Sequence, residues 1–226
     1  MNRLGQYISY FFYIGVNWNF RLAFFLIQHE VRGERKYSLN TCTINNLKTS
    51  VPEPLLRHAS IYQPVNFFIA EWLFEQVPEH LKDTVFADIG CGMGRVLVMA
   101  LYKGFKKVEG IDVSPEMCNH AIAILEDKIK DFSGSSFSIA CENAENHPIT
   151  EEVGVIFLFN PFDEFIMKGL IGQVIQSLLK KPRELMVLYA SPMHKSLWLD
   201  AGFRETCSTN KLKWLEGSVL FINPTA

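Results

Sequence analysis

The sequence lacks the cysteine spacing of a metal site or of a disulfide framework. Its 226 residues contain neither a Cys-x-x-Cys pair nor a Cys/His ligand cluster. The five cysteines are odd in number and widely spaced, at Cys42, Cys91, Cys118, Cys141 and Cys207. This distribution favours reduced thiols, as in a cytoplasmic protein, and predicts no bound metal.

A strong net charge is also missing. The 22 Lys and Arg residues nearly balance 24 Asp and Glu, so the formal charge is −2 and gives no global basis for binding a nucleic-acid backbone. The charge is uneven, because residues 1–60 hold seven Lys or Arg but three Asp or Glu. A hydrophobic content of 48% excludes wholesale disorder, and the length fits one domain with an appended segment.

Charge is nearly absent from residues 7–27, where Arg21 is the only charged side chain. A helix of this length could cross a bilayer, but Asn17, Asn19 and Arg21 would be costly in its interior. No small-residue cleavage site follows, which argues against a signal peptide. Three alternatives remain: a helix docked on the protein's own surface, a helix lying on a membrane surface, and a membrane span.

Residues 32–60 show no clean periodicity and contain two prolines, so they predict an irregular connector. The connector begins with Arg32, Arg35 and Lys36, a basic flank suited to the cytoplasmic side of a membrane. We therefore expect residues 1–60 to form an N-terminal hydrophobic helix and a connector. Residues 61–226 are expected to form the main domain.

From residue 64 onward, helical patterns alternate with short apolar runs, as in an α/β protein. Helices are predicted over residues 64–77, 94–102, 114–132, 164–179 and 194–201. Strands are predicted over residues 84–89, 107–112, 137–141, 153–159, 184–189, 203–208 and 217–222. The last two strands are joined by a short connection and must be antiparallel, so the pattern predicts a parallel sheet with an antiparallel edge.

A glycine-rich turn follows the first of these strands. Its sequence is Asp-Ile-Gly-Cys-Gly-Met-Gly-Arg over residues 88–95. Glycines there permit a tight turn and let a ligand approach the backbone amides. The spacing G-x-G-x-G differs from the G-x-G-x-x-G of dinucleotide enzymes, and no P-loop Lys-Ser/Thr pair follows. The turn therefore favours a ligand other than a dinucleotide or a nucleoside triphosphate.

Polar residues also follow the second, third and fourth predicted strands. Asp112 ends the second strand, where a carboxylate can accept hydrogen bonds from both ribose hydroxyls. Asn143 follows the third strand and offers a donor and an acceptor to an adenine edge, although a plain turn residue is the alternative. Asn160-Pro161-Phe162 follows the fourth strand. Asn160 could accept hydrogen bonds from a substrate amine and Phe162 could stack on it, although Asn-Pro is also a common turn.

Taken together, these motifs resemble class I S-adenosylmethionine-dependent methyltransferases. VFADIGCGMGRVLVMAL followed by VEGIDVSPEM is similar to motif I and its successor, and the resemblance covers roughly residues 60–222. It implies a seven-stranded sheet in the order 3-2-1-4-5-7-6, with strand 7 antiparallel and helices on both faces. It also implies S-adenosyl-L-methionine as cofactor. The residues implied to bind it are Asp88, Gly90, Cys91 and Gly92 for the methionine portion, Asp112 and Val113 for the ribose, and Asn143 and Ala144 for the adenine.

Within the class, the sequence resembles small methyltransferases that carry an Asn-Pro-Phe motif. Asn160-Pro161-Phe162 also resembles the Asn-Pro-Pro-Tyr/Phe signature of enzymes that methylate amino groups of adenine, guanine or glutamine, with one proline missing. The family usually has Asp at the position of Asn143. Tyr62-Gln63-Pro64 resembles a Tyr-x-Pro element of some lysine methyltransferases, which implies that Tyr62 folds over the active site.

We therefore expect an enzyme that methylates a nitrogen atom of a protein side chain or of a small-molecule amine. Asn160, Pro161, Phe162 and Tyr62 are the expected catalytic residues. The alternatives are a catalytically silent protein of the same fold that binds S-adenosylmethionine or associates with a membrane, and an RNA or nucleobase methyltransferase. A nicotinamide-dependent oxidoreductase is disfavoured by the glycine spacing and by the lack of a second nucleotide-binding half.

Overall fold

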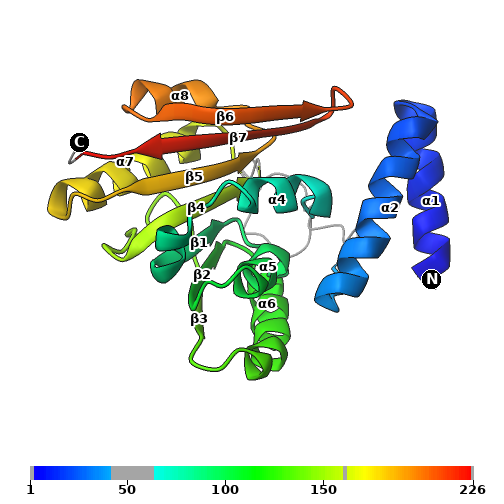
Figure 1. Ribbon diagram of the computed structural model, residues 1–226, viewed down its shortest axis with the longest axis horizontal. Coiled ribbons are helices and arrows are strands. Elements are labelled where there is room, and N and C mark those ends of the chain that lie inside the picture. Colours follow the sequence, from blue (N-terminus) through cyan, green and yellow to red (C-terminus); the bar gives the residue numbers. More distant parts are fainter. Residues whose placement is uncertain (1–2, 42–63, 160–161, 225–226) are drawn as a thin grey trace.

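A seven-stranded sheet forms the centre of the computed structural model, which describes residues 3–41, 64–159 and 162–224. The strand order is β3-β2-β1-β4-β5-β7-β6, and β7 runs antiparallel to both of its neighbours (Figure 1). The predicted order and the antiparallel edge are thus confirmed. The strands are β1 (Val85–Ile89), β2 (Lys107–Asp112), β3 (Ser136–Cys141), β4 (Val153–Phe159), β5 (Leu185–Ala190), β6 (Arg204–Lys211) and β7 (Leu215–Ile222).

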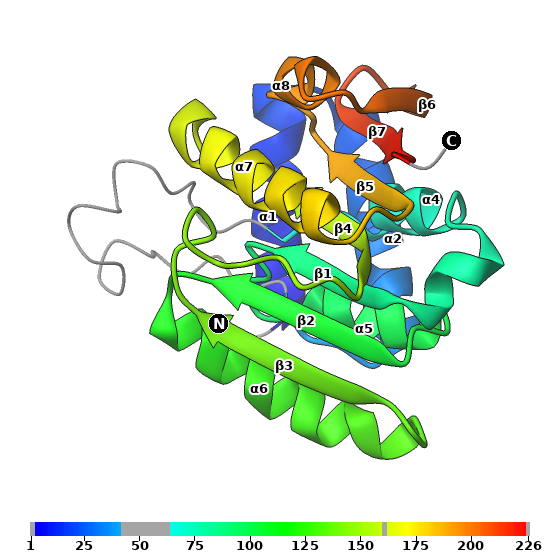
Figure 2. The ribbon, with the colours of Figure 1, turned by 90° about the vertical axis from the view of Figure 1, so that its left-hand side faces the viewer.

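Helices cover both faces of this sheet (Figures 1 and 2). On one face lie α4 (Phe67–Phe74), α5 (Arg95–Tyr102) and α6 (Pro115–Lys128), and on the other lie α7 (Glu164–Lys180) and α8 (Lys195–Asp200). Short 3-10 helices precede β1 (η2, Glu79–Asp83) and follow α6 (η3, Ile129–Asp131). Every residue of β1 and β5 is buried, and β4 is buried up to Leu158, because central parallel strands pack against helices on both sides.

Most element boundaries lie close to those predicted. Ser114 caps α6 with Pro115 in its first turn, but the helix ends at Lys128 and η3 replaces its predicted last turn. The largest difference is the β6–β7 hairpin, which extends to Lys211 and resumes at Leu215. Leu212 and Lys213 there have φ angles of 57° and 65°, so a tight turn lets both strands continue further than their hydrophobicity indicates.

The N-terminal segment differs from the single hydrophobic helix that was predicted. It forms two helices, α1 (Arg3–Asn17) and α2 (Phe20–Tyr37), which lie side by side (Figure 1). The break occurs at Asn19, whose side chain accepts a hydrogen bond from the backbone N–H of Leu22 at 2.7 Å. An asparagine cap of this kind starts a new helix because it satisfies a free amide of the first turn.

Helix α2 continues to Tyr37, so the first residues of the predicted connector are helical. Its inner side packs on α4 and α5, as the docked alternative required. Helix α2 approaches α4 closely at Gly33, where a Cβ atom would lie 2.1 Å from the ring of Phe67. In the described residues, no helix combines the length and the apolar character that crossing a membrane requires. Residues 42–63, which include most of the predicted connector, lie outside the described residues.

Candidate active site

The glycine-rich turn joins β1 to α5 at the carboxyl edge of the sheet. Gly90, Gly92 and Gly94 have φ angles of 80°, 52° and 80°, in the left-handed region that glycine adopts at little cost. The N–H of Gly90 donates to the carbonyl of Ile111 at 2.7 Å, which fastens the turn to the end of β2. At Gly94 a side chain would also lie 3.2 Å from the Cβ of Ala121, so this glycine lets α5 approach α6.

Asp112 is held beside this turn at the end of β2. One carboxylate oxygen accepts a hydrogen bond from the N–H of Gly92 at 2.8 Å, and the other accepts from the N–H of Ser114 at 2.9 Å. Burial raises the pKa of Asp112, and the amide donors oppose that rise. A carboxylate oxygen can accept more than one hydrogen bond, so Asp112 keeps capacity for the hydroxyl groups of a ligand.

Asp88 is the second acidic group of the site. It lies on β1, is 3% exposed, and its pKa is raised well above the usual value by burial and by the charge of Asp112. A bound cation would favour the ionised form of these two carboxyl groups, whereas a phosphate would not. Cys91 is also buried, and burial raises the pKa of its thiol, which fits a small apolar residue better than a nucleophile.

The residues expected to meet an adenine ring follow β3. Cys141 is the register partner of Asp112, so this strand end lies next to Asp112. Asn143 is half-buried, and its side-chain oxygen accepts from the N–H of Glu145 at 3.1 Å, while Ala144 is buried in the core. The Asn143 side chain therefore also has the turn role that was its alternative.

His147 fixes the same loop against β2. Its ring nitrogens lie 2.5 Å from Glu142 and 3.3 Å from Glu109. The hydrogen bond to Glu109, and then that to Glu142, raises the pKa of His147 despite its burial. The histidine thus stabilises the loop that carries Asn143.

The fourth strand ends at the same edge, because Ile89 of β1 pairs with Leu158 of β4. Phe162 is half-buried and packs against the core under α7, whose first turn is capped by Asp163. Val113 is likewise half-buried, just beyond Asp112. The other predicted catalytic residues, Asn160, Pro161 and Tyr62, lie outside the described residues.

Sequence reasoning assigned no role to Arg95, which the structure places at the first position of α5. This residue is 3% exposed, and its guanidinium forms a two-pronged ion pair with Glu30 of α2. It also donates to Thr41 Oγ1 at 2.7 Å and to the carbonyl of Val65 at 2.8 Å. The guanidinium carbon lies 4.2 Å from the ring centre of Phe67. Arg95 therefore links the glycine turn to the N-terminal helices. Its signal in the sequence was a single Arg directly after the turn.

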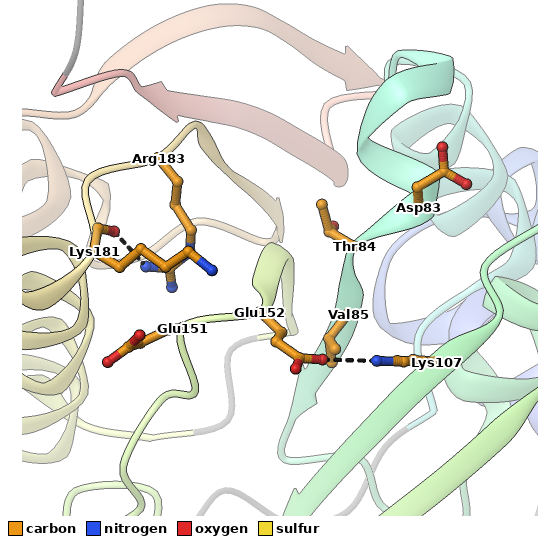
Figure 3. A pocket seen from close by; sticks show the side chains of 8 residues that line it. All are labelled: Asp83, Thr84, Val85, Lys107, Glu151, Glu152, Lys181 and Arg183. Carbon is orange, nitrogen blue, oxygen red and sulfur yellow. Dashed lines mark hydrogen bonds and ion pairs between the residues drawn. The ribbon is translucent and has the colours of Figure 1, made fainter.

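A pocket at the opposite edge of the sheet has a different character (Figure 3). It lies at the amino ends of β1, β2 and β4, and three of its charged side chains, Lys107, Glu152 and Arg183, have partners within the protein. Lys107 forms an ion pair with Glu152 at 2.8 Å, and Arg183 donates to the carbonyls of Thr150 and Val153. We assign this pocket a structural role, because ligands of open α/β sheets bind at the carboxyl ends of the strands.

The part of the chain that the structure describes contains no cluster of side chains suited to bind a metal ion. No group of three or more His, Cys, Asp or Glu side chains there could hold a metal ion. The four cysteines of that part are all free, and Cys42 lies outside it.

The fold agrees with comparisons to known proteins. A family model described as "Methyltransferase domain" matches residues 80–220. A ribosomal protein L11 methyltransferase from Psychrobacter arcticus is 28% identical over 100 residues, which are 42% of this chain and 32% of that protein. This chain thus spans about a third of the length of that curated relative.

Solved structures show the same fold. A putative methyltransferase from Escherichia coli has a TM-score of 0.55 at 17% identity, covering 71% of this chain and 87% of that one. An S-adenosylmethionine-dependent methyltransferase from Aquifex aeolicus has a TM-score of 0.52 at 17% identity, covering 68% and 89% of the two chains.

The chain belongs to the methyltransferase domain family, since the family model matches more than half of it. The matched residues form a methyltransferase domain, and the solved structures that share its fold include an S-adenosylmethionine-dependent methyltransferase. The residues at this edge fit S-adenosyl-L-methionine, the cofactor that the sequence motifs imply. The left-handed glycines let a ligand lie against the turn, Asp112 can accept ribose hydroxyls, and the carboxyl groups of Asp88 and Asp112 can ionise to balance a sulfonium or an ammonium group.

Proposed function

We propose that this protein methylates a nitrogen atom of a protein side chain or of a small-molecule amine, in the cytoplasm. The observation that carries the proposal is the placement of Asp112 between the amides of Gly92 and Ser114, at the edge where β4 also ends. A cofactor bound there lies next to the segment that carries Asn160-Pro161-Phe162.

The proposal assigns contact residues to each part of the cofactor. S-adenosylmethionine supplies a methyl group on a positively charged sulfur, which is a strong electrophile. The chain contributes binding and orientation, and the two carboxylates balance the positive charge. The proposed contacts are Asp88, Gly90, Cys91 and Gly92 with the methionine portion, Asp112 and Val113 with the ribose, and Asn143 and Ala144 with the adenine.

Asn160 is the proposed positioning group for the acceptor. Its side-chain oxygen and its backbone carbonyl accept hydrogen bonds from the amine, which turns the nitrogen lone pair toward the methyl carbon. The new N–C bond uses that lone pair, the electrons of the C–S bond remain on sulfur, and the amine proton leaves to solvent. Pro161 fixes the backbone, Phe162 packs on the acceptor, and Tyr62 covers the site.

A protein acceptor has the most support. The curated relative from Psychrobacter arcticus is a ribosomal protein L11 methyltransferase, and its matched segment is a part of that protein. A small-molecule amine is the second acceptor class, because the positioning chemistry is the same. The formal charge of −2 disfavours a nucleic-acid acceptor.

The test compares Asn160→Ala with Asp112→Asn, using S-adenosylmethionine with a radiolabelled methyl group and a cell extract as the acceptor source. We expect Asn160→Ala to keep cofactor affinity and to lose methyl transfer by about 10²-fold or more. Asp112→Asn should weaken cofactor binding itself. Asp200→Asn, on the exposed surface of α8, is the matched control and should change neither quantity.

Fractionation of the labelled extract identifies the acceptor class. Label in protein or in small amines supports the proposal, and label in nucleic acid contradicts it. Unchanged transfer by Asn160→Ala would remove the assigned role of that residue. Cofactor binding without any transfer would indicate a catalytically silent protein.

A further inference from the structure

The N-terminal helices present large apolar side chains to solvent. On α1, the side chains of Ile8, Phe12 and Val16 recur every four residues, so they lie along one side of the helix. Phe20 and Phe24 continue this surface on α2, and the exposed fractions of Val16 and Phe24 reach 76% and 65%. We call this surface, together with Tyr13, Trp18 and Trp214, the aromatic face.

Ring contacts show that the aromatic face is continuous across the two helices. The ring of Phe11 lies 5.6 Å from that of Phe12 and 5.7 Å from that of Phe20. Phe20 also packs over Gly15, where a Cβ atom would lie 2.4 Å from its ring. The aromatic side chains are therefore held in place by the packing of α1 on α2, although they remain exposed.

A distant part of the chain completes this face. The tip of the β6–β7 hairpin reaches the end of the helix pair where α1 turns into α2 (Figure 1). Leu212 and Leu215 pack against the small core between the helices, and Trp214 lies 6.1 Å from the ring of Trp18. The ring of Tyr13 lies 5.9 Å from that of Trp18. The extended hairpin thus adds a half-exposed tryptophan to the surface.

The charges around the aromatic face are mostly of one sign. Residues 1–29 contain no Asp or Glu, and Arg21 of this segment is exposed between Phe20 and Phe24. Lys211 and Lys213 are exposed on either side of the hairpin turn. Glu216, the acidic residue nearest the turn in sequence, accepts a hydrogen bond from Asn210 at 2.8 Å.

Two more arginines extend this basic margin along α2. Arg32 and Arg35 follow Arg21 after 11 and 14 residues, which are close to whole numbers of turns of 3.6 residues each. Both side chains are exposed, so the three arginines lie on the same side of α2. Phe24 lies one turn beyond Phe20 on the adjoining strip, which places the aromatic and basic strips next to each other.

We propose that the aromatic face, with Arg21, Lys211 and Lys213, binds the surface of a membrane that contains anionic lipids. Aromatic and aliphatic side chains beside Lys and Arg suit the headgroup region, where the apolar part enters the acyl boundary and the cations meet lipid phosphates. A second copy of this chain fits less well, because a symmetric contact would bring the same cations together. This binding is independent of the proposed methyl transfer.

Vesicle flotation of the full chain tests the proposal. The probes are vesicles of phosphatidylcholine alone and vesicles with about a third phosphatidylglycerol. We expect binding to the anionic vesicles that weakens with salt, since surface charges are screened. Phe12→Ser/Phe24→Ser and Arg21→Gln/Lys211→Gln/Lys213→Gln should each reduce partitioning on the order of tenfold or more.

Matched control variants distinguish binding through the aromatic face from nonspecific binding through other exposed apolar or basic side chains. Leu179→Ser removes an apolar side chain that is 78% exposed on α7, and Lys106→Gln/Lys180→Gln/Lys181→Gln removes three exposed cations elsewhere. Both should bind vesicles like the unmodified chain. Circular dichroism and the melting temperature check that every variant is folded.

Three results would overturn the proposal: no flotation with either vesicle, equal losses in the control variants, or a stable dimer that the Phe12→Ser/Phe24→Ser variant converts to monomer. Light scattering after size-exclusion chromatography measures the last of these. None of these readouts depends on methyl transfer, so failure here is distinct from failure of the proposed enzyme activity.

Discussion

Arg95 shows how one side chain can connect two parts of the molecule. Its charge is removed from water, and such a charge is tolerated because Glu30 and three further contacts surround the guanidinium. Glu30 belongs to α2, whereas Arg95 starts the helix after the glycine turn. The position of the N-terminal helices is thereby tied to the cofactor turn.

Replacing one residue of this ion pair should lower the free energy of unfolding more than replacing both residues. We expect Arg95→Met to lower the free energy of unfolding by about 3–5 kcal/mol, because Glu30 then remains buried without the Arg95 guanidinium to balance its charge. The double variant Arg95→Met/Glu30→Met should recover at least half of that loss. Urea unfolding of the single and double variants measures both values. A cost below about 1 kcal/mol for Arg95→Met would contradict a buried, essential pairing.

At the scale of elements, the packing of α2 on α4 depends on Gly33, a residue with no side chain. Gly33 lets the helix approach Phe67, which in turn stacks on Tyr37 with ring centres 5.7 Å apart. Helix propensity alone would favour alanine over glycine at this position. The docking of α2 on α4 therefore overrides the local preference.

Substituting alanine at each of two helical glycines should distinguish the effect of close packing from that of helix propensity on stability. Gly33→Ala is expected to destabilise the protein by about 1–3 kcal/mol, since its Cβ would overlap the Phe67 ring. Gly172→Ala, in the exposed part of α7 with nothing within 4 Å, should instead stabilise by up to about 1 kcal/mol. Thermal and urea unfolding measure both changes. Stabilisation by both substitutions would show that α2 is not closely packed on α4.

At the scale of the whole molecule, the sheet brings together residues that are far apart in sequence. The register pairs of β1 with β2 and β4, and of β2 with β3, place four strand ends at one edge. The chain beyond residue 64 forms that sheet and its covering helices, and the N-terminal pair attaches beside α4 and α5. Cofactor binding should therefore stabilise the domain as a unit.

Ligand-dependent melting tests the cofactor site without an acceptor. S-adenosylhomocysteine at a hundred times its dissociation constant should add about 2.7 kcal/mol of stability. For a chain of this size, that corresponds to a rise in Tm of roughly 5–10 °C. NAD at the same concentration should give no shift, because two carboxylates oppose its phosphates. A rise with NAD, or none with either compound, would contradict the assigned site.

The amino-acid sequence determined the fold class from its local patterns and the strand order through its family resemblance. Its assignment of cofactor-binding residues remains a prediction. The short apolar runs, the glycine spacing and the Ser114-Pro115 cap are all readable along the chain. The Arg95–Glu30 pair joins positions 65 residues apart, and the Trp18–Trp214 contact joins opposite ends of the chain. Only the tertiary structure could decide these contacts, because sequence periodicity does not encode which distant surfaces meet.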